Sequence, residues 1–161
     1  MILYFLRHAE AEEGYDINDH DRRLTEQGVR RTGTAARVMA SLGLCPAHIF
    51  SSPRARARQT AEIVAAALKG SVEISEEMNL GFSPQAVETL ISGLEAEGEV
   101  MFVGHEPSMS AVIEEITGAR VDMKKCGLAR IDLLAYAPPQ GVLIWLIPPK
   151  VFDVLAQKPR G

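Results

Sequence analysis

Met1-Ile2-Leu3-Tyr4-Phe5-Leu6-Arg7-His8-Ala9-Glu10 is the stretch of sequence that decides the fold. Five consecutive apolar residues, Ile2 to Leu6, run directly into Arg7 and His8. A short, unbroken apolar run is typical of a strand that is buried on both faces, as in a parallel sheet. Open α/β sheets bind ligands just beyond the carboxyl ends of such strands. An arginine beside an imidazole at that position favours the handling of an anion.

The composition is that of an ordinary globular protein. Of the 161 residues, 47% are hydrophobic and 24% are charged, so we expect a single domain over residues 1–161. Seventeen basic residues against 21 acidic ones give a net charge of −4, which disfavours nucleic acid or an anionic membrane as the main partner. Nine of the 12 arginines nevertheless lie between Arg7 and Arg58, and this clustering predicts a local basic surface.

Several functional classes lack their usual sequence signals. No apolar segment approaches the roughly 20 residues of a membrane span, and the first residues do not resemble a signal peptide. Cys45 and Cys126 show no metal-binding or redox spacing, and the four histidines show no ligand spacing. We therefore expect a cytoplasmic monomer that uses no metal and no cofactor.

The order of the expected elements predicts the architecture. Apolar runs predict strands at residues 48–51, 72–74, 100–103, 128–134 and 142–147 after the first strand. Helices are expected from Thr25 to Gly43, from Ser52-Pro53 to about residue 68, from Ser83-Pro84 to about residue 96 and from Pro107 to about residue 118, with a short one after Pro148-Pro149. This order, βαβαβαβαββ, predicts a three-layer α/β/α sandwich. Its central sheet is mostly parallel and ends in an antiparallel hairpin that turns at residues 138–141.

Smaller features have structural interpretations. We expect Val29, Thr32, Ala36 and Met39 to face inward from the first helix, and the acidic loop 10–21 to be solvated. Ser51, Ser52 and Ser108 are interpreted as helix caps, and His20 and His48 as surface or loop residues.

Three strand-to-helix junctions carry the residues that fit a chemical role. They hold Arg7-His8, the segment Ser51 to Thr60, and Gly104-His105-Glu106-Pro107. In a parallel sheet these junctions share one edge, where helix N-termini add a partial positive charge. The combination predicts a phosphate or other oxyanion site. A neutral imidazole is a good nucleophile toward phosphorus, and nearby arginines oppose its protonation and bind the phosphoryl oxygens.

These motifs resemble those of the histidine phosphatase (phosphoglycerate mutase-like) superfamily. Leu6-Arg7-His8-Ala9 is similar to its Arg-His-Gly signature, with Ala9 in place of the usual glycine. Ser52-Pro53-x-x-Arg56-Ala57-x-x-Thr60 and Val103-Gly104-His105-Glu106-Pro107 resemble its second arginine and second histidine motifs. The stretch Arg22 to Gly28 and the ending Pro148-Pro149-Lys150 resemble, more narrowly, the SixA-type phosphohistidine phosphatases.

The resemblance implies a role for each matching residue. His8 is the nucleophile and becomes transiently phosphorylated, while Arg7, Arg56 and His105 bind the phosphoryl group. Arg22 matches an arginine near the phosphate, although Arg23 replaces the proline that follows it in the family. Arg54 and Arg58 lie two residues to either side of Arg56, so on a helix they would not share its face, although they can enlarge the positive field. Arg22 and Arg54 are further candidates for binding the substrate.

A carboxylic acid that protonates the leaving group is harder to assign. Glu77, after the third strand, is one candidate, and Glu10 and Glu106 are others. Such an acid matters less for phosphohistidine, because imidazole is a better leaving group than an alkoxide. The leading hypothesis is therefore a metal-independent phosphohistidine phosphatase that acts on a phosphorelay or phosphotransfer protein. The alternatives are a phosphatase of small phosphate esters or sugars in the same superfamily, and a non-catalytic phosphate-sensing or scaffold domain.

Overall fold

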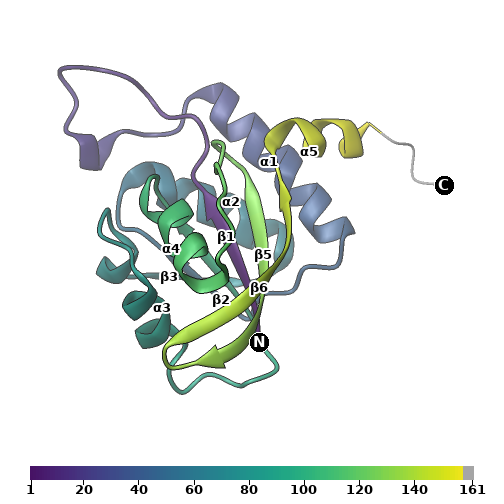
Figure 1. The fold of residues 1–161 in the computed structure, drawn as a ribbon. Helices are drawn as coiled ribbons and strands as arrows, with labels where there is room; N and C mark the ends of the chain where they lie inside the picture. Colours follow the sequence, from purple (N-terminus) through teal and green to yellow (C-terminus); the bar gives the residue numbers. More distant parts are fainter. Residues whose placement is uncertain (158–161) are drawn as a thin grey trace.

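The structure, a computed structural model, describes residues 1–157 (Figure 1). Its strands are β1 (Ile2–Arg7), β2 (His48–Ser51), β3 (Ser71–Ile74), β4 (Glu99–Gly104), β5 (Leu128–Tyr136) and β6 (Pro139–Ile147). Its α-helices are α1 (Glu26–Ser41), α2 (Ala55–Leu68), α3 (Pro84–Ile91), α4 (Ser108–Thr117) and α5 (Pro149–Ala156). Two short 3₁₀ helices, η1 (Asp19–Asp21) and η2 (Glu76–Met78), lie in the loops after β1 and β3.

The six strands form one mixed sheet in the order β3-β2-β4-β1-β5-β6. The first four strands in that order run parallel to one another, β5 runs antiparallel to β1, and β6 runs antiparallel to β5. The predicted mostly parallel sheet with a C-terminal antiparallel hairpin is confirmed. Because β1 lies between β4 and β5, its carboxyl end is in the middle of the sheet edge.

Helices cover both faces of the sheet, as the apolar first strand predicted (Figure 1). Tyr4 and Leu6 of β1 belong to the core beneath α1, α2 and α5, whereas Leu3 and Phe5 belong to the core beneath α3 and α4. All four side chains are buried, with at most 2% of their surface exposed. Alternate residues of a strand point to opposite faces, so a run that is apolar throughout supplies both cores.

Helix α1 starts as expected but turns a different face to the core. Thr25 is its N-cap, since the Thr25 hydroxyl accepts a hydrogen bond from the backbone N–H of Gly28 at 3.0 Å. Val29 was predicted to face inward, yet it is 43% exposed. Gly28 takes the inner position, where a Cβ would lie 2.1 Å from the carbonyl oxygen of Glu10. The close approach of the chain leaving β1 therefore requires a glycine and turns Val29 outward.

Two helix boundaries differ from the prediction. Helix α2 begins at Ala55, with Arg54 as an extended N-cap residue, so Ser52-Pro53 precedes the helix rather than opening it. Helix α3 ends at Ile91, not near residue 96, because Ser92 leaves the helical region and Gly93 has a positive φ of 80°. The periodicity of apolar residues continues past that point, but the backbone turns.

The C-terminal hairpin is longer than predicted. Its strands reach Tyr136 and Pro139, so only Ala137 and Pro138 lie between them. The turn predicted at residues 138–141 thus falls partly within β6. The short helix expected after Pro148 is confirmed as α5.

No helix within residues 1–157 has both the length and the apolar character that crossing a membrane requires. The single domain expected over residues 1–161 stays a prediction.

Candidate active site

The three junctions do meet at one edge of the sheet. The backbone N–H of His8 donates to the carbonyl of Gly104, and that of Ser52 donates to the carbonyl of Val103, both at 3.1 Å. These bonds fasten the residues after β1 and β2 to the end of β4. They bring the His8 and His105 rings together, with centroids 5.1 Å apart.

His8 has one ring nitrogen engaged by the backbone and the other available for chemistry. Its Nδ1 lies 2.7 Å from the carbonyl oxygen of Ala9. A carbonyl only accepts hydrogen bonds, so Nδ1 carries the proton and Nε2 keeps its lone pair. The Nε of Arg56 donates to this Nε2 at 3.3 Å. Ala9, which stands where the family has glycine, is buried without disrupting this arrangement, and its N–H donates to Thr60.

The surroundings of His8 oppose its protonation. Only 8% of the residue is exposed, and burial lowers the pKa of His8 from 6.5 to about 4. The positive charges of Arg56, Arg7 and Lys125 act in the same direction, while the hydrogen bond to Ala9 opposes them. At neutral pH the imidazole is therefore neutral, as a nucleophile must be.

His105 is held differently. Its Nε2 lies 2.7 Å from the hydroxyl oxygen of Ser52, and its buried Nδ1 has no hydrogen-bond partner among residues 1–157. Burial, followed by the neighbouring His8 and Arg56, lowers the pKa of His105 to about 3. The interpretation of Ser52 as the helix cap is wrong, because the N-cap of α2 is Arg54. The Ser52 hydroxyl accepts a hydrogen bond from the Arg54 N–H at 3.3 Å and also fixes the ring of His105. The only signal for this role in the sequence was its place at the start of the second arginine motif.

Arg7 and Arg56 approach His8 from different directions. Arg7 comes from the end of β1, and its Nη1 donates to the carbonyl of Met123 at 2.8 Å. The buried Nε of Arg7 has no partner within the part of the chain that the structure describes. Arg56 comes from the first turn of α2 and is 5% exposed. Both guanidinium groups lie close enough to His8 to lower its pKa.

Arg54 joins Arg56, contrary to the prediction that the two would not share a face. Both donate to the carboxylate of Asp19, Arg56 through Nη2 at 3.2 Å. The helical argument failed because Arg54 is the N-cap residue, with extended backbone angles (φ −67°, ψ 135°). Arg58 does follow the prediction: it points away and lies 3.8 Å from Glu62.

Arg22 also reaches this carboxylate. Its Nη1 donates to Asp19 at 2.9 Å, and its Nε donates to the carbonyl of Glu12 at 2.6 Å. Arg23 departs from the family's proline, and its backbone N–H donates to the Glu12 carboxylate at 3.0 Å. Proline has no N–H, so this bond exists only because of the exchange. The interpretation of loop 10–21 as merely solvated is wrong at Asp19, where it meets three arginines.

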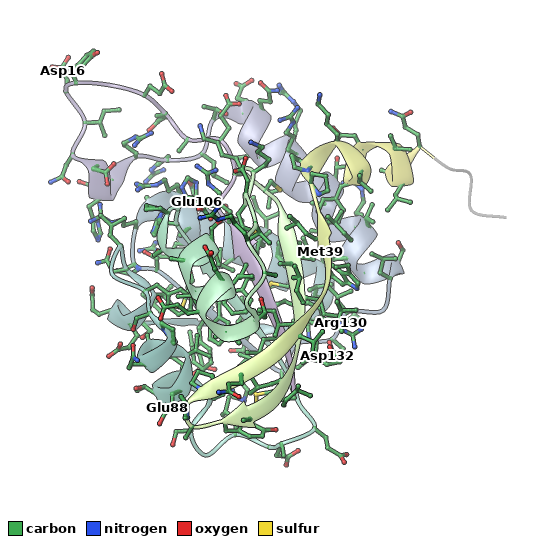
Figure 2. All side chains as sticks on the ribbon, viewed as in Figure 1. Asp16, Met39, Glu88, Glu106, Arg130 and Asp132 are labelled. Atoms are coloured by element: carbon green, nitrogen blue, oxygen red, sulfur yellow. The ribbon has the colours of Figure 1, made fainter. Side chains whose placement is uncertain are left out.

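The three candidate acids have unequal positions. Glu77 is exposed on η2, and no hydrogen bond or ion pair within residues 1–157 joins it to His8, Arg56 or His105. Glu10 lies 3.4 Å from the Thr25 hydroxyl, which donates to it. Glu106 is half-buried beside His105, and burial raises the pKa of its carboxyl, although hydrogen bonds from Ser110 and the charge of Arg7 oppose the rise. Figure 2 labels Glu106 at the start of α4. Glu106 is thus the candidate whose environment best suits proton donation.

The other two histidines lie outside this cluster, as expected. His20 is exposed on η1, and His48 pairs with Glu73 of β3 at 2.7 Å. Among residues 1–157, no group of three or more His, Cys, Asp or Glu side chains is arranged to hold a metal ion.

Comparisons with known proteins show what the whole chain is similar to. Residues 3–80 match the model of the histidine phosphatase superfamily (branch 1). An uncharacterized protein of Picosynechococcus sp. is 36% identical over 139 residues, which cover 80% of this chain and 82% of the relative.

Two solved structures share the fold. One is the protein histidine phosphatase SixA complexed with tungstate, with a TM-score of 0.83 and 22% identity, covering 94% of this chain and 99% of the other. The second is the putative phosphohistidine phosphatase SixA from Agrobacterium tumefaciens, with a TM-score of 0.76 and 29% identity, covering 91% and 96%. Together with the family match, these similarities show that the chain belongs to the histidine phosphatase superfamily.

Proposed function

We propose that the protein is a phosphohistidine phosphatase that works without a metal ion and forms a phosphoenzyme on His8. The observation that carries the proposal is the state of the His8 ring. Its Nδ1 is bound to a backbone carbonyl, and its Nε2 lone pair faces the Arg56 guanidinium in a buried site. A superfamily of phosphatases supplies the reaction class, and the ring supplies a nucleophile that is neutral at physiological pH.

The first chemical step transfers the phosphoryl group to His8. The lone pair of Nε2 attacks phosphorus, a bond forms between Nε2 and phosphorus, and the bond from phosphorus to the substrate nitrogen breaks. When the other ring nitrogen of the substrate carries a proton, its imidazole leaves as a neutral molecule. A dedicated acid is then unnecessary, which agrees with the exposed position of Glu77.

The second step returns the enzyme to its starting state. Water attacks phosphorus, and the bond to Nε2 breaks with its electron pair returning to Nε2. One proton of the attacking water passes to solvent, and inorganic phosphate leaves as the monohydrogen dianion. Arg7, Arg56 and His105 stabilise the charge on the phosphoryl oxygens in both steps. The unpartnered buried nitrogens of Arg7 and His105 support this role, because a phosphoryl oxygen would provide the missing acceptor for an N–H at either position.

A protein-borne phosphohistidine is the substrate class that we favour. The similarity to the putative phosphohistidine phosphatase of Agrobacterium tumefaciens, at 29% identity, supports it. Glu106 adds a second route: with its raised pKa it can protonate an oxygen leaving group, so phosphate esters form the alternative substrate class.

A substrate comparison tests the proposal. The purified protein is given a phosphohistidine-bearing phosphotransfer domain and, separately, phosphorylated sugars, and phosphate release is measured with and without a chelator. We expect kcat/KM to be highest for the phosphohistidine protein and to be unaffected by the chelator. Higher kcat/KM for the sugars would select the alternative substrate class. No turnover of any phosphate compound would favour the non-catalytic phosphate-sensing domain.

A pair of variants tests the role of Arg56: Arg56→Ala is the test, and Arg58→Ala is its matched control. Arg56 contacts His8, whereas Arg58, on the same helix, points to Glu62. Loss of one oxyanion donor typically lowers the rate by ~10²–10³, so we expect that decrease for Arg56→Ala and little change for Arg58→Ala.

A further inference from the structure

The arginines of the site already hold an anion that belongs to the protein itself. The carboxylate of Asp19 accepts hydrogen bonds from Arg22, Arg54 and Arg56. Its backbone carbonyl accepts a further bond from Nη1 of Arg56 at 2.7 Å. Partial burial acts to raise the pKa of Asp19, but the guanidinium groups of Arg22, Arg56 and Arg54 outweigh it and hold this pKa below its usual value. Asp19 is therefore charged whenever the site is at neutral pH.

All three nitrogens of the Arg56 guanidinium donate a hydrogen bond in this arrangement. Its Nε donates to His8, its Nη1 to the Asp19 carbonyl and its Nη2 to the Asp19 carboxylate. Arg54 is similarly engaged, with its Nε donating to Asn79 at 2.8 Å and its Nη1 to Asp19. A phosphoryl group that binds the Nη1 and Nη2 end of Arg56 shares these two nitrogens with Asp19 and therefore competes with its contacts.

The segment that carries Asp19 is attached to the rest of the molecule mainly at its base. We call the residues from Glu12 to Arg23 the Asp19 loop. A bridge between Ala11 and Leu24 and a hydrogen bond from the Glu12 N–H to the Arg23 carbonyl at 2.8 Å close its neck. Every residue from Glu13 to Asp21 is exposed, and Figure 2 shows Asp16 projecting at the tip. A closed neck with an exposed tip is the form of an Ω-loop.

The loop is hollowed on its own inner side and open to solvent. A pocket of about 460 Å³ is lined by loop residues alone, namely Glu13, Gly14, Tyr15, Ile17, Asp19 and Arg22. The side chain of Asp19 is 49% exposed, so water can replace the arginines as its partner when it leaves them. The contact is thus one that can open without unfolding the sheet or its helices.

We propose that Asp19 is an internal competitor for the phosphoryl group. In the free protein it occupies the guanidinium groups of Arg22, Arg54 and Arg56, and the phosphate must displace it. A phosphate dianion has more charge and more acceptor atoms than a carboxylate, so displacement is favourable, but the apparent affinity is reduced by the population in which Asp19 is bound. The inference rests on the proposed function, because it takes the phosphoryl group to bind at Arg56.

Binding of inorganic phosphate to Asp19→Asn tests this inference without requiring turnover. The substitution removes the negative charge and retains the size of the side chain, and the backbone contact to Arg56 remains. We expect the Kd for phosphate, measured by isothermal titration calorimetry, to fall by about threefold to tenfold. A rise in Kd would overturn the inference, because Asp19 would then be holding the arginines in position for phosphate.

Asp21→Asn is the matched control. Asp21 lies on the same 3₁₀ helix, and its carboxylate contacts His20 rather than the arginines. A general effect of charge would lower the Kd equally in both variants, and that result would also overturn the inference. If the wild-type protein and Asp19→Asn both fail to bind phosphate, the proposed function fails as well. Binding by the wild-type protein with no change in Asp19→Asn rejects the competition alone.

Discussion

His8 and His105 lie at the ends of neighbouring parallel strands, yet their rings have different hydrogen-bond partners and are followed by different connections. His8 leaves β1 into a long loop, and its Nδ1 is bound to the adjacent carbonyl of Ala9. His105 leaves β4 almost directly into α4, and its Nε2 is bound to the side chain of Ser52 from β2's end. Both rings are buried, and both have a depressed pKa. The difference lies in the hydrogen-bond partners: both ring nitrogens of His8 have one, whereas Nδ1 of His105 has none among residues 1–157.

This contrast fits the two roles proposed above. A nucleophile needs a fixed ring with an unprotonated nitrogen, and the backbone contact of His8 provides both, while Arg56 donates to that nitrogen in the free protein. A group that binds oxygen needs an orientation relative to the nucleophile, and Ser52 provides that by joining the second junction to the third. Two similar residues in one cluster are therefore not interchangeable.

Replacing each histidine in turn tests whether the two have different roles, and it is expected to give the largest effect. We expect His8→Ala to lower kcat by more than ~10³, because no phosphoenzyme can form, and His105→Ala to lower it by ~10²–10³, because one oxygen-binding group is lost. The measurement is single-turnover kinetics with a phosphohistidine protein, combined with trapping of a labelled phosphoenzyme.

The trapped label supplies the control. Label should remain on the His105→Ala protein and be absent from the His8→Ala protein. Label that survives in His8→Ala would assign the nucleophile to another residue. Retained binding of inorganic phosphate by His8→Ala would show that the variant is folded.

The low pKa values predict a loss of stability in acid. Folded His8 and His105 take up protons only near pH 4 and pH 3, whereas unfolded histidines do so near pH 6.5. Between these values the unfolded state binds more protons, so the stability present above pH 6.5 is lost as the pH falls. Each histidine adds a slope of up to about 1.4 kcal/mol per pH unit to the free energy of unfolding.

Urea denaturation at pH 7, 6 and 5 measures this slope. His8→Asn and His105→Asn should each flatten it. If the slope is the same in all three proteins, the acid sensitivity comes from other groups, and the proposed electrostatic environment of the two histidines is wrong.

Substitution of Ser52 is expected to give the smallest of these effects on kcat. Ser52→Ala removes the hydroxyl that orients His105 but leaves every catalytic group in place. A net hydrogen bond of about 1 kcal/mol corresponds to a fivefold to tenfold decrease in kcat, with little change in KM. Ser51→Ala is the control, because the equally buried Ser51 donates to the carbonyl of Ser52 and not to a histidine. Equal effects of the two substitutions would mean that both act through packing.

Much of this site was predictable because the carboxyl ends of parallel strands lie at the same edge of a sheet. The apolar run of β1 identified a strand buried on both faces, and the alternation of strands and helices placed His8, Arg56 and His105 at one edge. Those conclusions depend on the backbone alone, and the sheet order confirms them. Thr25 and Ser83 were also recognisable as N-caps, because a side-chain cap is a local interaction.

The errors share a different cause, which is contact between distant segments. Val29 was placed inside because nothing in its own helix shows that the chain at Glu10 passes so close to Gly28. Arg54 was separated from Arg56 because the start of α2 lies two residues later than predicted, which makes Arg54 an extended residue rather than a helical one. The contacts of Asp19 with Arg54 and Arg56, and of Ser52 with His105, join residues that are tens of positions apart, so no local pattern reveals them.

The closed neck between Ala11 and Leu24 has a consequence for how such an enzyme can be redesigned. Because the bridge fixes both ends of the Asp19 loop, residues between them can be added or removed without moving His8 or α1. The entropy of loop closure grows only slowly with length, by about 0.6 kcal/mol per doubling. The length and sequence of the Asp19 loop can therefore change while β1 and α1 stay in place, which makes this loop the natural place to alter the contacts of the arginines that Asp19 meets.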